Sequence, residues 1–151
     1  FADIDNDGDL DVYMQMGGAY ASDRFNDALY KNPGFDNNWL SLKLVGTKSN
    51  RCAIGARIHA VIEENGVERS IHRRVGSGGS FGCNPLREHL GLGKSTEVKR
   101  LEVHWPTSNT TQVFESIPAG HRLRITESSN SFERLELEQE STDRSSHFRL
   151  P

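Results

Sequence analysis

Hydrophobic and polar residues alternate along the middle of the chain, and this alternation predicts β-strands. In "LEVHW", Leu101, Val103 and Trp105 fall on one face of an extended chain, while Glu102 and His104 fall on the other. Turn residues separate such runs, at "VG", "NG", "GSGG", "WPTSN" and "IPAG". The runs are "WLSLKLV", "ARIHAVI", "VERSIHRRV", "VKRLEVHW", "TQVFESI" and "HRLRITE". This spacing predicts an all-β domain over residues 38–127, an antiparallel β-sandwich or barrel. The only helical signal is one turn near "PLREHLGLG".

One hairpin has a predictable register. Asn65-Gly66 lies between two strand-like runs and has the composition of a two-residue turn. Pairing outward from it sets His59 opposite His72 and Arg57 opposite Arg74. The same register puts Arg69 and Arg73 on the face of Ile58 and Ile62, which disfavours charge. A bulged three-residue turn therefore remains an alternative.

The two ends of the chain differ from this middle part. Residues 1–36 are rich in loop residues, and residues 128–151, "SSNSFERLELEQESTDRSSHFRLP", are polar, charged and rich in serine. Such a composition is typical of a disordered tail, which we expect over 128–151.

The segment "DIDNDGDLD" carries the clearest chemical signal. It places aspartates at alternate positions, and carboxylates that close together repel one another unless a cation lies among them. Calcium prefers such oxygen ligands. We predict a calcium site formed by Asp3, Asp5, Asp7, Asp9 and Asp11. Asp9 would contribute its backbone carbonyl, and Gly8 would allow a sharp turn. The alternative is a solvated acidic turn.

The loop is not an EF-hand, because Met14 stands where that motif needs a bidentate acid. Instead, "FADIDNDGDLDVYM" followed by "ALYKNPG" resembles the FG-GAP/VCBS repeat, a calcium-loop blade motif of β-propellers. Since one repeat cannot form a propeller, the resemblance implies that residues 1–36 are part of a terminal blade. We therefore expect the chain to be the C-terminal part of a larger protein, with upstream blades as partners.

The following residues resemble a second family. "NNWLSLKLVGTKSNRCAIGARI", "VGSGGSFG", "LGLG" and "LEVHWPTS" are similar to the ASPIC/UnbV domain, which commonly follows VCBS repeats in secreted proteins. The same order occurs in the cartilage acidic protein family. The resemblance implies a secreted or cell-surface location, whereas the family's biochemical activity is poorly defined.

Charge and composition argue against two classes of protein, those that bind nucleic acids and those that span a membrane. A net charge of −3 argues against a nucleic-acid partner, and no apolar run is long enough for a membrane span. Cys52 and Cys83 are either a disulfide or two inert buried thiols. We predict a non-catalytic, calcium-binding, adhesion-like module with a protein or glycan partner.

Alternative sites are weaker. "GGSFG" has the G-x-S-x-G pattern of a serine hydrolase, with Ser80 as nucleophile and Glu102 and His121 as partners, but the helix this motif needs is missing. His59 and His72 could share a metal, although neighbouring arginines would repel it.

A carbohydrate-binding module is the other alternative. Trp39 and Trp105 could stack on sugars, although their alternating positions favour the core. A basic set could bind anionic ligands such as acidic glycans, or could be solvated or paired with Glu63, Glu64 and Glu68. The set is Arg57, Arg69, Arg73, Arg74 and Arg87.

Overall fold

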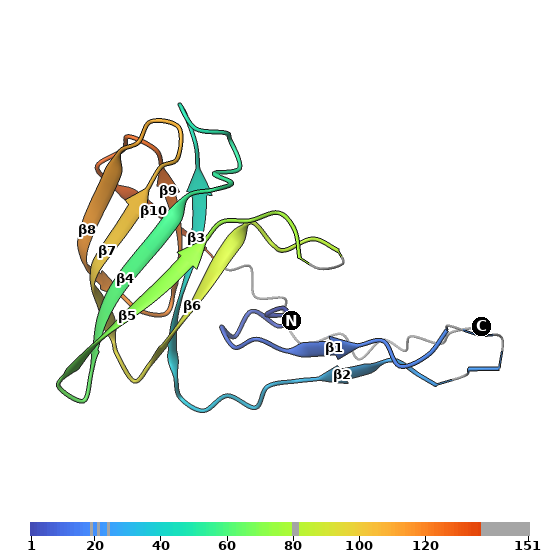
Figure 1. Cartoon of the computed structure of the whole chain (residues 1–151). Coiled ribbons are helices and arrows are strands. Elements are labelled where there is room, and N and C mark those ends of the chain that lie inside the picture. The colour runs from blue at the N-terminus through green and yellow to red at the C-terminus, as the bar shows by residue number, and fades with distance from the viewer. Residues whose placement is uncertain (19, 21, 24, 80–81, 137–151) are drawn as a thin grey trace. The chain divides into compact units, whose positions relative to one another are not determined.

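A computed structural model describes residues 1–18, 20, 22, 23, 25–79 and 82–136 of the chain. Its regular elements are all strands, which form one two-stranded sheet and two four-stranded sheets (Figure 1). The all-β prediction is confirmed, and because none of these sheets closes on itself, the sandwich is favoured over the barrel. The described residues form two compact units, Phe1–Pro33 and Gly34–Glu136.

The first unit contains a small antiparallel sheet of β1 (Val12–Met14) and β2 (Ala28–Tyr30). An isolated bridge between Ala2 and Asp11 closes the aspartate segment just before β1. Many large apolar side chains of this unit are exposed, among them Phe1, Tyr13, Met14, Leu29 and Tyr30. Two short strands alone have little capacity to bury such groups.

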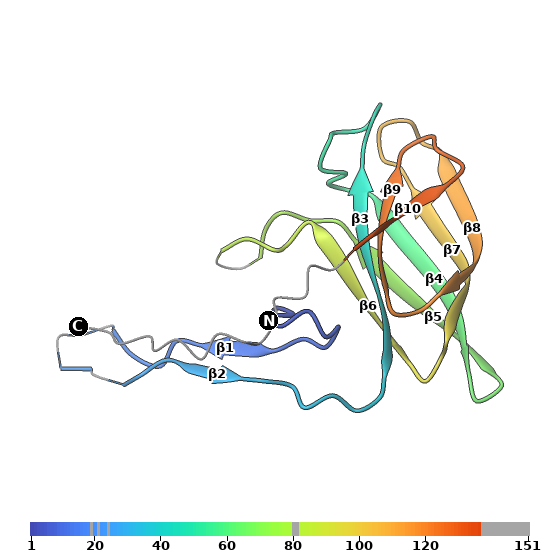
Figure 2. The ribbon, with the colours of Figure 1, turned by 180° about the vertical axis from the view of Figure 1, so that it is seen from behind.

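The second unit is a sandwich of two four-stranded sheets, seen from opposite sides in Figures 1 and 2. One has the order β10-β9-β3-β6, with β3 parallel to β9, and the other, antiparallel, has the order β5-β4-β7-β8. The strands are β3 (Asn38–Val45), β4 (Arg57–Glu64), β5 (Val67–Arg74), β6 (Arg87–Gly93), β7 (Glu97–His104), β8 (Thr111–Pro118), β9 (His121–Thr126) and β10 (Phe132–Leu135).

Alternate residues of both sheets meet in one apolar core. Each sheet contributes regular rows of fully or almost fully buried side chains, including Leu40, Leu42 and Leu44 from β3 and Ile58, Ala60 and Ile62 from β4. Trp105 is completely buried, so it belongs to the core and is not a sugar platform. Trp39 is half-buried and stacks on His89 with ring centroids 5.9 Å apart.

The β4–β5 hairpin has the predicted two-residue turn. Asn65 and Gly66 both have positive φ, 53° and 77°, as a tight hairpin turn requires. The pairs His59–His72 and Arg57–Arg74 are confirmed, and the bulged alternative is wrong. Arg69 and Arg73 do lie opposite Ile62 and Ile58, but β5 is an edge strand, and both arginines remain exposed.

Two sequence-based expectations need correction. Residues 87–93, expected to include a helical turn, form strand β6, because Leu90 and Leu92 alternate into the core while the chain pairs with β3. Part of the expected tail is also ordered: β10 pairs with β9, and Phe132 packs edge-on against Phe114 at 6.0 Å. Residues 137–151 of that tail lie outside the described residues.

A buried carboxylate holds together the end of the sandwich where β3 ends and β4 begins. Glu127, directly after β9, is 2% exposed. Its Oε2 accepts hydrogen bonds from the backbone N–H groups of Thr47, Lys48 and Ser49 at 2.8, 2.7 and 2.7 Å. Its Oε1 accepts from the hydroxyls of Ser49 at 2.9 Å and Ser108 at 2.6 Å. One side chain thus connects the β3–β4 loop with the β7–β8 loop.

These bonds keep Glu127 ionised. Burial by itself favours the neutral acid, but donors from Ser108, Ser49 and Thr47 outweigh it and lower the pKa of Glu127 from 4.5 to about 2. The folded-state pKa is therefore below that of the unfolded chain. It follows that the ionised group stabilises the fold fully above about pH 5, and that this contribution is lost as the pH falls toward 2.

We predict that Glu127→Gln lowers the free energy of unfolding by about 2–3 kcal/mol at pH 7, because the charge-assisted bonds are lost. The loss should shrink as the pH is lowered from 5 to 2, and urea unfolding followed by tryptophan fluorescence measures both effects. The control is Glu133→Gln. Glu133 lies on β10, is exposed and forms an ion pair with Arg124 of β9, so its substitution should lower the free energy of unfolding by less than about 1 kcal/mol. Equal losses for the two variants would contradict the assigned role.

Candidate functional site

The aspartate segment folds so that three of its carboxylates converge. Oxygen atoms of Asp3, Asp5 and Asp7 lie within 4.8 Å of one another. Positive φ values at Asn6 (62°) and Gly8 (96°) curl the chain and bring these side chains together. The backbone N–H of Asp9 donates to Asp7 Oδ1 at 2.9 Å, which tightens the turn.

Asp11 has a different position from these three residues. It is 2% exposed, and its two carboxylate oxygens accept backbone N–H groups of Ile4, at 3.0 Å, and Asn32, at 2.8 Å. It therefore connects the start of the loop to the residues after β2. Neither Asp9 nor Asp11 contributes a side chain to the cluster of three.

A lysine also contacts the cluster. Lys31 forms an ion pair with Asp5, and its ammonium lies 4.0 Å from Asp7 Oδ2. The hydrogen bond from Lys31 lowers the pKa of Asp5, and the same contact raises the pKa of Lys31. The ammonium thus compensates part of the negative charge of the loop.

The donor set fits a calcium ion. Calcium binds oxygen ligands at about 2.3–2.6 Å, so the oxygens around one ion lie within about 5 Å of one another. The three carboxylates of Asp3, Asp5 and Asp7 satisfy this spacing. Lys31 and a bound cation would compete for the same oxygens.

The histidine pair predicted across the hairpin is present, but it is not arranged for a metal. The rings of His59 and His72 stack with centroids 4.4 Å apart and planes 1° apart. Both nitrogens of His59 have polar neighbours at 3.1 Å, Nδ1 with Glu102 Oε2 and Nε2 with Ser70 Oγ. In this arrangement neither nitrogen of His59 is free to ligate an ion.

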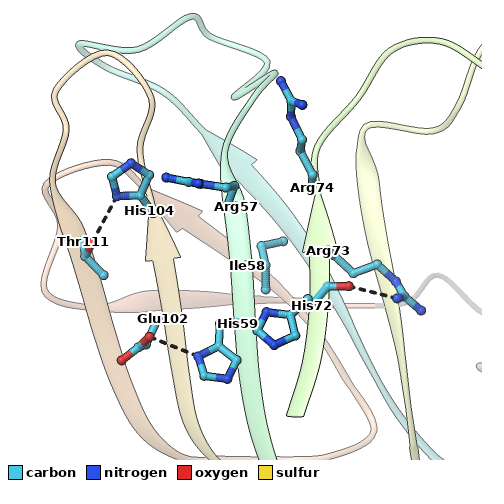
Figure 3. Close-up of a pocket in the computed structure, with 9 residues that line it drawn as sticks. All are labelled: Arg57, Ile58, His59, His72, Arg73, Arg74, Glu102, His104 and Thr111. Carbon is cyan, nitrogen blue, oxygen red and sulfur yellow. Dashed lines mark hydrogen bonds and ion pairs between the residues drawn. The ribbon is translucent and has the colours of Figure 1, made fainter.

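These histidines lie in a hollow of about 550 Å³ on the outer face of the sheet β5-β4-β7-β8, which we call the Arg57 hollow (Figure 3). Its lining includes Arg57, Arg73, Arg74, His72, His104 and Thr111.

The structure divides the basic set predicted from the sequence. Arg57, Arg73 and Arg74 line the Arg57 hollow, whereas Arg69, near the start of β5, lies 3.6 Å from Glu64. Arg87 lies on the other sheet, in a second hollow of about 990 Å³ that also includes Lys43, Arg51 and Arg124. The sequence did not reveal Lys43 and Arg124 as members of a basic group, because only strand pairing brings them beside Arg87.

The remaining candidates are not brought together. Ser80 lies outside the described residues, and its proposed partners Glu102 and His121 lie on different sheets, in β7 and β9. Cys52 and Cys83 are both exposed free thiols, so the expectation of buried thiols is wrong.

In a comparison with protein families, the family described as ASPIC and UnbV matches residues 46–132, more than half of the chain. The chain belongs to this family. The match covers the sandwich from the loop after β3 to the first residue of β10, and the aspartate loop precedes it. A comparison with curated proteins gave no significant match. Within the described residues, no helix is long and apolar enough to cross a membrane.

Proposed function

We propose that this ASPIC/UnbV family member is a non-catalytic, calcium-binding module of a secreted or cell-surface protein, with an adhesion-like binding role. The observation that carries the proposal is the convergence of Asp3, Asp5 and Asp7 within 4.8 Å. Such a cluster is hard to keep together without a cation, and a hard dication suits three carboxylates better than one ammonium.

In this proposal the three carboxylates hold the ion, and the Asp9 carbonyl supplies a further oxygen. Asp11 does not bind the ion through its side chain but holds the loop in place, because its carboxylate accepts hydrogen bonds from the backbone N–H groups of Ile4 and Asn32. The bound ion supplies positive charge that cancels the repulsion within the loop. Binding to the folded loop alone stabilises this unit by mass action, so that calcium makes the first unit more rigid.

The exposed apolar side chains of the first unit support a terminal position in a propeller. Phe1, Tyr13, Leu29 and Tyr30 are each more than half exposed. A two-stranded sheet whose large apolar side chains are exposed is what a blade leaves when its neighbours are removed. We infer that upstream FG-GAP/VCBS-type blades cover these residues in a longer protein.

We predict that calorimetric titration of the chain with calcium gives saturable binding at one site, which is lost in the double variant Asp5→Ala/Asp7→Ala because two of the three converging carboxylates are gone. The control double variant, Glu68→Ala/Glu115→Ala, removes the same charge from exposed positions of the second unit and should bind as the original chain does. Heats of calcium binding that are identical in all three proteins, or absent in all three, would contradict the proposed site.

We further predict that Lys31→Gln strengthens calcium binding about threefold to tenfold, because the substitution removes the ammonium that competes for Asp5 and Asp7. The gain should be largest at low ionic strength, where an exposed charge is least screened. Lys48→Gln, in the loop after β3, removes the same charge elsewhere and should leave the affinity unchanged. An equal change in both variants would show a general charge effect and not competition at the loop.

A further inference from the structure

Four residues in register form a row across the outer face of the sheet β5-β4-β7-β8. Arg74 pairs with Arg57, Arg57 with His104, and His104 with Thr111. The row contains two guanidinium groups and an imidazole but no carboxylate. Like charges placed directly opposite each other destabilise a sheet, so this row is costly unless an anion joins it.

Neither Arg57 nor Arg74 forms an ion pair with any carboxylate of the described residues, although cations elsewhere on the same sheet do. Lys99 pairs with Glu63, and Arg100 lies 2.9 Å from Glu102. The positive charge is therefore compensated by carboxylates away from the row and uncompensated within it.

The carboxylate that lines the Arg57 hollow, that of Glu102, is already engaged. Glu102 has His59 Nδ1 at 3.1 Å and Arg100 at 2.9 Å, and these two contacts hold the pKa of Glu102 below its usual range. Figure 3 shows the Arg57 side chain extended toward His104, away from Glu102. His104 Nδ1 lies 3.2 Å from the Thr111 hydroxyl. The Arg57 hollow thus offers a guanidinium, an imidazole and a hydroxyl along one wall.

A second basic row lies on the other sheet. Lys43 pairs with Arg87 on one side and with Arg124 on the other, next to the hollow of about 990 Å³. In this row Arg124 is paired with Glu133 at 2.7 Å. Both rows are near the end of the sandwich where β3 ends and β4 begins, because Lys43 is close to the end of β3 and Arg57 opens β4. This basic end therefore has room for more than one anionic group.

We propose that the basic end of the domain binds a sulfated acidic polysaccharide, with one sulfate in the Arg57 hollow and further sulfates along the row of Lys43 and Arg87. A guanidinium fork matches two oxygens of an oxyanion, and a sulfate ester has three to offer to Arg57, Arg74 and His104. At about 550 Å³ the hollow has the size of a small-ligand site, enough for a sugar unit together with its sulfate.

A nucleic acid fits these features less well. Proteins that bind nucleic acids through phosphates make roughly six to ten such contacts, whereas each row here offers two or three cations. The net charge of −3 also provides no general attraction for a long phosphate chain. The inference gives a ligand to the proposed binding role, and it does not depend on the calcium loop.

The test is calorimetric titration of the chain with a heparin-derived hexasaccharide, once in a buffer that contains EDTA and once in a buffer that contains calcium. The double variant Arg57→Gln/Arg74→Gln should weaken binding at least about tenfold in both buffers. Arg69→Gln, on the same strand but paired with Glu64, is the matched control and should remain within twofold. Thermal unfolding shows that the variants are folded; the double variant should be at least as stable as the original chain, since it removes a like-charge pair.

Further titrations make the ligand class explicit. An unsulfated hyaluronan hexasaccharide should bind much more weakly than the sulfated one, and Lys43→Gln/Arg87→Gln should weaken the hexasaccharide more than a sulfated disaccharide. Absence of binding to the sulfated hexasaccharide, equal losses in the Arg57/Arg74 and Arg69 variants, or tighter binding of duplex DNA would each overturn the inference. A loss of calcium binding with sulfate binding intact would overturn only the calcium proposal.

Discussion

One buried charge organises the end of the sandwich on which the proposed binding surface depends. The loop after β3 must return the chain from one sheet to the other, and it leaves the backbone N–H groups of Thr47, Lys48 and Ser49 pointing into the protein. Glu127 accepts all three with one oxygen and two serine hydroxyls with the other. A buried carboxylate without such donors would be neutral or would unfold the loop, whereas with them it remains ionised.

The same constraint determines where the basic residues lie. This loop opens with a glycine, Gly46, because a Cβ at that position would lie only 2.2 Å from the carbonyl oxygen of Asn50 and would clash with it. With the loop held, β3 ends at Val45 and β4 begins at Arg57, so Lys43 and Arg57 come to the same end of the domain on opposite sheets. The negative charge of Glu127 is enclosed by its donors, and therefore this end presents mainly cations on its surface.

The two units of the chain have opposite electrostatic requirements. The loop of the first unit brings three carboxylates together, with the ammonium of Lys31 beside two of them, while Arg57 and Arg74 in the Arg57 hollow form no ion pair with a carboxylate of the described residues. Each arrangement costs free energy in the protein alone and is relieved by a ligand of opposite charge. Such a local excess of one sign of charge is a better guide to a binding site than the net charge of −3, which averages over the acidic loop and the basic hollow.

Alternation of apolar and polar residues was enough to predict the all-β fold and most strands, and Asn65-Gly66 determined the register of one hairpin, because a two-residue turn leaves a single pairing. The spacing of Asp3, Asp5 and Asp7 likewise indicated a converging cluster. Strand β10 was missed because its composition is polar apart from Phe132, which packs against the core, and β6 was missed because its glycines weaken the alternation. Tertiary structure alone decided that Glu127 meets residues about eighty positions earlier in the chain, and that Arg69 pairs with Glu64 while Arg57 and Arg74 have no ion-pair partner among the described residues. Those contacts depend on which strands become neighbours in a sheet, and that choice is made by burial of the whole core and not by any local run of residues.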